Sequence, residues 1–307
     1  MNIQQKLKFI QQTSGLTQEQ LAQKLGVSFA TVNSWMRGRS VPRKKAEERI
    51  NTLFLELTGQ KVIPESLLSA KKARILSLQK QHKNVLEEIT GSPDIYDSFL
   101  LSLTYNTNSI EGNSLTEPET AAVLFQNTAL SNKDIIEQLE VKNHQAAWEF
   151  ILNSLPKSKK IDEQFILQLH GKLMNGIRQD AGVYRNHSVR IVGANVPTAN
   201  YAKVPIVMRE LVEDVVHAKK EIIAHVSDIH ARFEQIHPFS DGNGRIGRLL
   251  IHTMLLRKNL PPAVIRQENK RFYYSYLQKA QQTKDASLLE DFICDAVLEG
   301  YNILKRK

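Results

Sequence analysis

The sequence predicts an all-α protein with one small β-hairpin, in which a small helical unit precedes a larger helical domain. Over most of the chain, apolar residues recur three and four positions apart, as from Ile222 to Ile236, which is the spacing of helices with one buried face. The alternation typical of strands is confined to residues 182–197. Near the N-terminus, two short helical patterns are separated only by Gly26-Val27-Ser28, a tight turn between helices.

Length and composition indicate a soluble protein. A chain of 307 residues is long enough for two domains and an ample core. Cys294 is the single cysteine and cannot form an internal disulfide, so nothing indicates an oxidising compartment. No apolar run approaches the length of a membrane span, and the N-terminus has no apolar signal region. We expect a cytoplasmic protein with no membrane partner.

Positive charge is concentrated near the N-terminus. The chain carries a formal net charge of +9, and residues 1–60 contain nine Lys or Arg against four Glu. The first fifth of the chain therefore accounts for more than half of the excess. A basic unit of this size suggests an anionic partner.

Residues 1–60 are expected to form a domain of short helices. Thr17-Gln18-Glu19-Gln20 is a capping box that opens one helix, and Gly26 ends it. Ser28 caps a second helix, which directs Val32 and Trp35 inward. Two helices in this arrangement form a helix-turn-helix, whose second helix enters the major groove of DNA.

The segment from Leu16 to Pro42 resembles the lambda-repressor/Cro-like family over nearly its whole pattern. The resemblance implies binding to double-stranded DNA, with two copies of the chain on a symmetric site, so a homodimer is expected. The same fold also serves as an oligomerisation or docking module, which is the alternative. The residues available for DNA on the outer face of the second helix are Ser28, Phe29, Thr31, Asn33, Ser34 and Arg37.

Residues 61–94 are predicted to be a helical linker or a solvated flank, because they are helix-biased and basic. The second domain is expected over residues 95–300. Near its start, residues 104–113 form a helix on which Thr107 and Glu111 share one face, and Gly112-Asn113 end it.

The most informative stretch runs from His237 to Arg248. Pro238 ends the preceding helix, and an apolar helical pattern resumes at Ile246, so a loop leads into a helix N-terminus. Glycines in that loop allow close approach of a ligand, and the unpaired N–H groups with the helix dipole favour an anion. A phosphate fits this place.

Side chains of the same stretch suit a nucleotide. Arg245 and Arg248 are three apart and carry guanidinium forks that match phosphate oxygens. Asp241 is a hard oxygen ligand for Mg²⁺, and His237 can accept a proton near neutral pH. A glycine-rich turn between two core helices would explain each residue separately. The remaining histidines show no spacing suited to a zinc site.

The string H-P-F-x-D-G-N-G-R-x-x-R, complete in this stretch, resembles the signature of the Fic family, enzymes that transfer AMP from ATP to hydroxyl side chains of proteins. The resemblance implies that His237 deprotonates a Ser, Thr or Tyr of the target, that Asp241 holds Mg²⁺ and that Arg248 clamps the γ-phosphate. The backbone from Gly242 to Gly244 and the Asn243 side chain would receive the developing charge. Gly244 favours AMP transfer, because a phosphorylating relative has lysine there.

Three further features gain a meaning from this resemblance. Thr107-Asn108-Ser109-Ile110-Glu111-Gly112 is similar to the inhibitory helix of Fic proteins, whose glutamate pairs with the second arginine, here Arg248. Residues 182–197 would be the flap that holds the target segment, although an ordinary surface hairpin also fits. The nucleotide-binding residues implied are Phe239, Asp241, Gly242, Asn243, Gly244, Arg245, Arg248, the flap residues Val192, Gly193, Ala194 and Asn195, and Tyr273, Tyr274 and Gln281 near the adenosine. Core packing explains at least one of the tyrosines equally well.

These observations predict a protein adenylyltransferase that uses ATP and Mg²⁺, is inhibited by Glu111 and binds DNA through its N-terminal domain. Two alternatives remain. The enzyme could remove AMP with Glu111 orienting a water, or the chain could be a DNA-binding regulator whose second domain senses nucleotide. A transferase that represses its own operon would combine both activities.

Overall fold

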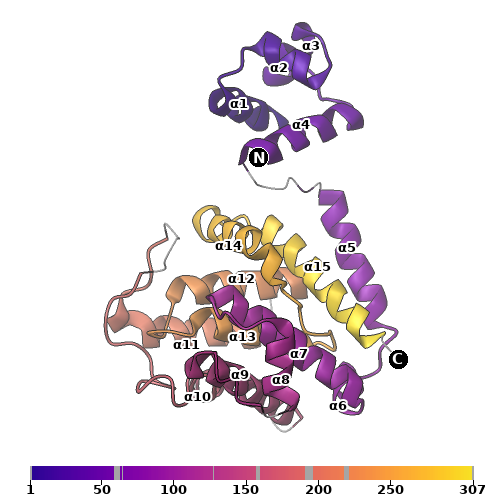
Figure 1. Ribbon diagram of the computed structural model, residues 1–307. Helices are drawn as coiled ribbons and strands as arrows, with labels where there is room; N and C mark the ends of the chain where they lie inside the picture. The colour runs from indigo at the N-terminus through magenta and orange to yellow at the C-terminus, as the bar shows by residue number, and fades with distance from the viewer. Residues whose placement is uncertain are drawn as a thin grey trace. The chain divides into compact units, whose positions relative to one another are not determined.

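A computed structural model describes residues 2–58, 63, 65–126, 128–156, 160–190, 196–217 and 221–305. The chain divides into two compact units, Met1–Glu65 and Ser66–Lys307 (Figure 1). Every regular element in the described residues is a helix, which confirms the all-α class. No described helix is long and apolar enough to cross a membrane.

The first unit is built from short helices with the expected caps. Its helices are α1 (Ile3–Ser14), α2 (Gln18–Leu25), α3 (Phe29–Met36) and α4 (Lys44–Thr58). Thr17 and Gln20 form the predicted capping box of α2, and Gly26 ends that helix at φ 67°, a conformation that glycine adopts without strain. Ser28 caps α3 by accepting from Thr31 N–H. Leu21, Val32 and Trp35 are buried in the core of the unit, so the inward face was predicted correctly.

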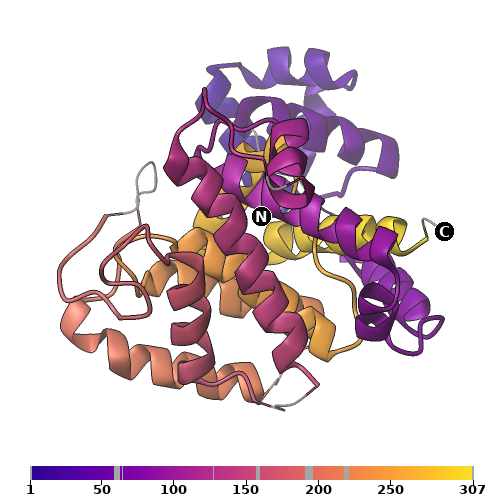
Figure 2. The ribbon, with the colours of Figure 1, turned by 60° about the horizontal axis from the view of Figure 1, so that its bottom comes forward.

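The second unit surrounds one buried helix, α13. The elements of this unit are α5 (Glu65–Gln79), α6 (Val85–Thr90), α7 (Pro93–Glu111), α8 (Glu117–Phe125), α9 (Ile135–Ser154), α10 (Glu163–Leu173), η1 (Tyr201–Lys203), α11 (Val204–Val216), α12 (Ile222–Ile236), α13 (Asn243–Arg257), η2 (Gln267–Asn269), α14 (Lys270–Thr283) and α15 (Ser287–Leu304). Helix α13 is buried from Arg245 to Leu256. It packs against α7, α10 and α12, and both views show it inside the unit (Figures 1 and 2).

Helix α5 is largely exposed, as expected for a flank, and ion pairs hold it to the second unit. Lys71 pairs with Asp291 and Asp295 at 2.6 Å each. Lys72 pairs with Glu221 at 2.9 Å and with Glu290 at 2.5 Å. These carboxylates lie on α15 and at the start of α12, so the basic residues of α5 join it to the second unit. The sequence shows the charge of α5 but not the acidic partners, which come much later in the chain.

The predicted hairpin is not supported. Residues 182–190 and 196–200 contain no strand, and Val192, Gly193, Ala194 and Asn195 lie outside the described residues. Thr198 Oγ1 donates to Val189 O over 2.9 Å, so the two arms approach each other through a side chain. The alternation of apolar residues in 182–197 therefore does not correspond to strands, and the described residues of this segment are irregular.

Candidate active site

The loop between α12 and α13 has a residue in the left-handed backbone conformation at each end. His237 follows α12 at φ 51°, and its N–H donates to Phe233 O over 2.9 Å. Gly242 has φ 76° and precedes the first residue of α13. The predicted break at Pro238 and the loop that leads into a helix N-terminus are thus confirmed, and the helix begins at Asn243. The open N-terminus of α13 provides unpaired N–H groups at the end of a buried helix, where an anion is favoured.

Asn243 closes this loop with its side chain. Its Oδ1 accepts from Phe239 N–H, and its Nδ2 donates to Phe239 O, both over 2.9 Å. The resemblance predicted that the Asn243 amide receives charge developing on the phosphate. In this structure the amide is engaged with Phe239, and the N–H groups of the helix start are left for that role.

His170 clamps the same loop from α10, a contact that sequence reasoning missed. Its ring stacks on Phe239 with centroids 3.7 Å apart and planes 3° apart. Its Nδ1 accepts from Gly182 N–H over 2.8 Å, so its Nε2 carries the proton and donates to Asp241 O over 3.1 Å. Burial lowers the pKa of His170 to about 4, which keeps the ring neutral and this arrangement fixed.

His237 has the protonation state that a general base requires. Its Nδ1 lies 3.2 Å from Glu234 O, and because a carbonyl only accepts, Nδ1 carries the proton. Nε2 is then the basic nitrogen. Burial lowers the pKa of His237 below its ordinary value, with a smaller contribution from Arg185, so the ring is neutral at pH 7.

Arg185 anchors the base, and no signal in the sequence singled it out. Its side chain is 3% exposed. Nε donates to His237 O over 2.7 Å, and Nη2 donates to Ala199 O over 2.6 Å and to Ile236 O over 3.3 Å. Nη1 donates to His187 O over 2.7 Å. One guanidinium therefore ties both arms of the irregular segment 182–200 to the catalytic loop.

Asp241 is the one carboxylate of the loop, and it is exposed. Its side chain is 53% exposed, and Oδ1 accepts from Gly242 N–H over 2.6 Å. In the part of the chain that the structure describes, no three His, Cys, Asp or Glu side chains gather into a metal site. A single exposed carboxylate suits Mg²⁺ shared with phosphates, because that ion is commonly held by one or two carboxylates and the nucleotide.

The two arginines of the motif point to different partners. Arg245 Nη1 donates to Glu140 Oε1 over 2.6 Å, and its side chain is buried. That Arg245 binds a phosphate beside Arg248 stays a prediction; here its charge is paired with a carboxylate of α9, and its Nη2 lies 3.8 Å from Asp241 Oδ1. Spacing on one helix predicted neighbours but not the partner across the core.

Arg248 is bound by α7, where the inhibitory residues were predicted. Its Nε donates to Thr107 Oγ1 over 2.7 Å, and its Nη2 donates to Thr107 O over 3.2 Å. Nη2 also donates to Glu111 Oε1 over 2.6 Å in an ion pair. Thr107, Glu111 and Arg248 are thus brought together from positions about 140 residues apart.

Gly244 makes room for Glu111. A Cβ at position 244 would overlap Oε1 of Glu111, so the carboxylate is seated directly on the first turn of α13. An anion at that turn is stabilised by the helix dipole, as a phosphate would be. Glu111 therefore occupies a place that suits a phosphate.

The three residues predicted near the adenosine have different environments. Tyr273 is buried, its hydroxyl is 2.7 Å from His230 Nε2, and Arg248 lies over its ring at 5.8 Å. Tyr274 is 38% exposed, and burial of the rest raises its pKa to about 12. Gln281 Nε2 donates to Ala231 O over 3.1 Å. Tyr273 is thus a core residue beside Arg248, and Tyr274 is the tyrosine that a ligand can reach.

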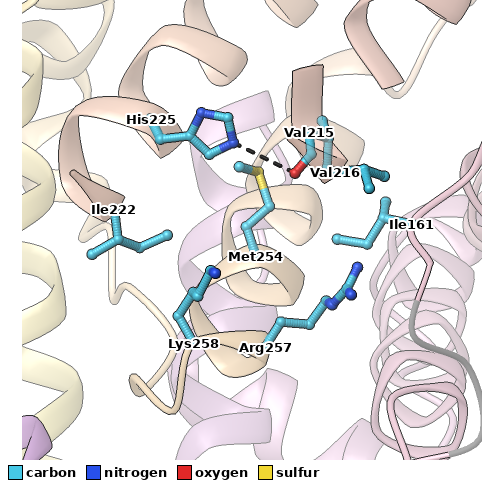
Figure 3. A pocket seen from close by; sticks show the side chains of 8 residues that line it. All are labelled: Ile161, Val215, Val216, Ile222, His225, Met254, Arg257 and Lys258. Carbon is cyan, nitrogen blue, oxygen red and sulfur yellow. Dashed lines mark hydrogen bonds between the residues drawn. The ribbon is translucent and has the colours of Figure 1, made fainter. Parts of the chain in front are cut away.

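A cavity lies at the C-terminal end of α13 (Figure 3). Its lining is mixed, with Arg257 and Lys258 beside apolar side chains, and His225 Nε2 donates to Val215 O over 3.5 Å. The lining residues are Ile161, Val215, Val216, Ile222, His225, Met254, Arg257 and Lys258. The predicted site residues lie at the other end of the helix.

Some side chains on the predicted DNA-binding face of α3 hydrogen-bond to other side chains of the first unit. Ser28 and Thr31 hydrogen-bond each other over 2.8 Å, and Ser34 Oγ lies 2.7 Å from Ser40 Oγ. Phe29 is 46% exposed, Arg37 is exposed and Asn33 is half-buried. Phe29, Asn33 and Arg37 are therefore the side chains most available to a ligand.

Comparison with known proteins agrees with both resemblances. Residues 160–255 match the Fic/DOC family model, and residues 12–46 match a helix-turn-helix model. The chain is 32% identical over 184 residues to the protein adenylyltransferase Fic of Aedes aegypti, covering 58% of this chain and 36% of that protein. It is 33% identical to the protein of the same name from Nematostella vectensis, covering 57% of this chain and 42% of that one.

A solved structure shares the fold. A Fic domain containing signaling protein from Bacteroides thetaiotaomicron superposes with a TM-score of 0.65 at 24% identity, covering 78% of this chain and 95% of that chain. The match spans only about two fifths of the length of these curated relatives or less.

Replacing Arg185 should loosen the loop. Arg185→Ala leaves the carbonyls of His237, Ile236 and Ala199 without their donor, and each unpaired buried group costs about 1–3 kcal/mol. We expect a clear drop in the thermal midpoint of unfolding. Arg178→Ala is the control, since Arg178 pairs with Asp180 at the surface. Equal midpoints for both variants would contradict the anchoring role.

Proposed function

We propose that this chain, which carries a Fic/DOC domain behind a helix-turn-helix unit, is a protein adenylyltransferase that moves AMP from ATP to a hydroxyl side chain of a protein. The observation that carries the proposal is the loop from His237 to Gly242. It presents a neutral imidazole beside the open N-terminus of a buried helix. The target is a Ser, Thr or Tyr hydroxyl.

The reaction follows from the protonation state of His237. Nε2 removes the proton of the target hydroxyl as its oxygen attacks the α-phosphorus of ATP. The new P–O bond forms while the bond from the α-phosphorus to the bridging oxygen breaks, and pyrophosphate leaves. The backbone N–H groups of Asn243 and Gly244 stabilise the charge on the phosphate oxygens, and that of Gly242, which donates to Asp241 Oδ1 in this structure, joins them when released.

Asp241 is the residue that would hold Mg²⁺, and its exposed carboxylate is suited to a cation shared with the nucleotide. The ion would neutralise phosphate charge. Arg248 would bind the γ-phosphate once it is released from Glu111.

Glu111 is the proposed inhibitor. Its ion pair with Arg248 occupies the guanidinium, and its carboxylate lies on the first turn of α13. ATP must displace this carboxylate or bind with a misplaced α-phosphate. A second candidate function is removal of AMP. The Glu111 side chain is 30% exposed beside the loop and could orient a water that attacks the AMP ester, releasing AMP and the free hydroxyl.

The first unit is proposed to bind double-stranded DNA, as a homodimer on a symmetric site. The support is a basic helix-turn-helix with Phe29 and Arg37 on its outer side. A transferase of this design could act in the cytoplasm on a protein partner while bound to DNA. Mass spectrometry of a cell lysate incubated with labelled ATP and the Glu111→Gly variant would test the transferase activity and identify the target.

His237→Ala should abolish AMP transfer and leave ATP binding largely intact, because the base acts on the hydroxyl and not on the phosphates. Transfer by the parent should fall only at a pH below the ordinary pKa of histidine. The pKa of His237 is lowered, so protonation disables the base only at a pH below its ordinary value near 6.5. Labelled-AMP incorporation against pH measures both effects. Equal transfer by parent and variant would refute the mechanism.

Asp241→Ala should weaken ATP binding only when Mg²⁺ is present. The carboxylate acts on the nucleotide through the cation, so removing it cancels the gain that Mg²⁺ brings. Calorimetric titration with and without Mg²⁺ compares the two conditions. A similar loss of affinity without the ion would assign Asp241 a different role.

Glu111→Gly should raise AMP incorporation by about tenfold or more, since each tenfold corresponds to about 1.4 kcal/mol. The change frees Arg248 and removes a negative charge from the phosphate site. Gly244→Ala should act in the same direction, because its Cβ overlaps the seated carboxylate. Adding Arg248→Ala should silence Glu111→Gly. If Glu111→Gly is no more active than the parent, the ion pair has no inhibitory role.

The full chain should bind duplex DNA with an affinity that falls steeply with salt, because phosphate contacts release counterions. Arg37→Ala should weaken binding and reduce the salt slope by about one. Fluorescence anisotropy at several salt concentrations measures both. Lys305→Ala, at the far end of the chain, is the control and should bind as the parent does.

A further inference from the structure

Glu234 is a buried carboxyl group that the proposed reaction does not use. It lies on α12 one turn before His237, and its backbone oxygen accepts from His237 Nδ1. Its side chain is buried, and a Cβ on Gly247 would overlap Oε1. The carboxyl group therefore packs against α13 next to Arg248.

Two glycines on α13 make room for two carboxyl groups. Gly244 leaves space for Glu111 from α7, and Gly247, three residues on, leaves space for Glu234 from α12. Positions three apart lie on the same side of a helix. The Cβ position of Gly244 is also 3.2 Å from Arg248 Nη1. The guanidinium thus has one carboxyl group of α7 and one of α12 near it.

Several buried polar atoms of these groups have no hydrogen bond. Among the described residues these include Arg248 Nη1 and Glu234 Oε1, together with His230 Nδ1, which lies 3.1 Å from the Cβ position of Gly247. Nε and Nη2 of the same guanidinium are taken by Thr107 and Glu111. An unpaired buried polar group costs about 1–3 kcal/mol, so an arrangement that pairs Nη1 with Oε1 is favoured.

We propose that Glu234 is a positioning residue for Arg248: its carboxyl group accepts from Nη1 when Nη2 exchanges Glu111 for a phosphate, and so keeps the guanidinium directed at the nucleotide. This inference rests on the proposed function for the role of Arg248. It assigns to α12 a fixed partner for an arginine whose other contacts come from α7.

The charges around Glu234 fit this role. Burial raises its pKa to about 8, Arg248 opposes that rise and Glu111 adds to it, so the group is largely protonated while Glu111 is seated. The other titratable groups close by are neutral at pH 7. Burial lowers the pKa of His230 and of His252 to about 3, and it raises the pKa of Tyr273 well above its usual value and that of Tyr274 to about 12. While Glu111 is seated, the local charge is thus carried mainly by Glu111 and Arg248.

A phosphate on Nη2 replaces the negative charge of Glu111 and keeps the pKa of Glu234 raised. Without any anion there, the pKa is lower, so a larger fraction of Glu234 is ionised at a given pH. In a Glu111→Gly protein, ATP binding should therefore take up a proton, and affinity should fall as pH rises through the interval between the two pKa values. Glutamine imitates the protonated carboxyl group and cannot ionise.

The test is calorimetric titration with ATP from about pH 7 to about pH 9, with every variant carrying Glu111→Gly and His237→Ala so that no transfer occurs. Adding Glu234→Leu should weaken binding by roughly tenfold, because Nη1 loses its acceptor. Adding Glu234→Gln should hold affinity within about threefold and abolish the pH dependence. Asp228→Asn is the control, since Asp228 lies on the same helix and pairs with Arg232 at the surface.

Unchanged affinity in the Glu234→Leu variant would overturn the proposal, and so would a pH dependence that Glu234→Gln leaves unaltered. If the Glu234→Leu variant does not fold, the comparison of Glu234→Gln with its parent decides. If no protein of the series binds ATP, the proposed function itself fails.

Discussion

The structure of the second unit depends on how it accommodates the guanidinium of Arg248 inside its core. The side chain is 2% exposed. Burial alone would lower the pKa of Arg248, and the Glu111 carboxylate reverses this, so the charge is retained. A buried charge is tolerated when it is paired and hydrogen-bonded, and here α7 supplies the carboxylate, a hydroxyl and a carbonyl. The contact between α7 and α13 is therefore centred on an ion pair. The loop from His237 to Gly242 leads directly into the start of the same helix α13.

The parts of the fold predicted from the sequence are those set by local chemistry. The capping box at Thr17, the glycine at 26 and the break at Pro238 act within one turn of chain, so their residue types suffice. The pairing of Glu111 with Arg248 was also expected, through a resemblance and not through geometry. Their sequence positions alone would not have placed them together.

The parts that were missed or wrong depend on contacts between distant segments. Arg185 and His170 reach the loop from 52 and 71 residues away, and neither has a local pattern that distinguishes it from an ordinary polar residue. The spacing of Arg245 and Arg248 predicted neighbours on one helix, but the pairing of Arg245 with Glu140 of α9 was missed. The alternation in residues 182–197 indicated a hairpin, whereas the described part is held by the Arg185 side chain without a strand.

The close fit of Glu111 against Gly244 has a consequence for how such chains diverge. The carboxylate at 111 can be seated only while position 244 has no side chain, so the two positions are linked although they lie far apart in the sequence. A substitution at 244 changes the space at the helix start and the seat of the carboxylate in a single step. In the descendants of a chain like this one, a larger residue at 244 removes the steric basis for keeping glutamate at 111, and that position is then free to drift.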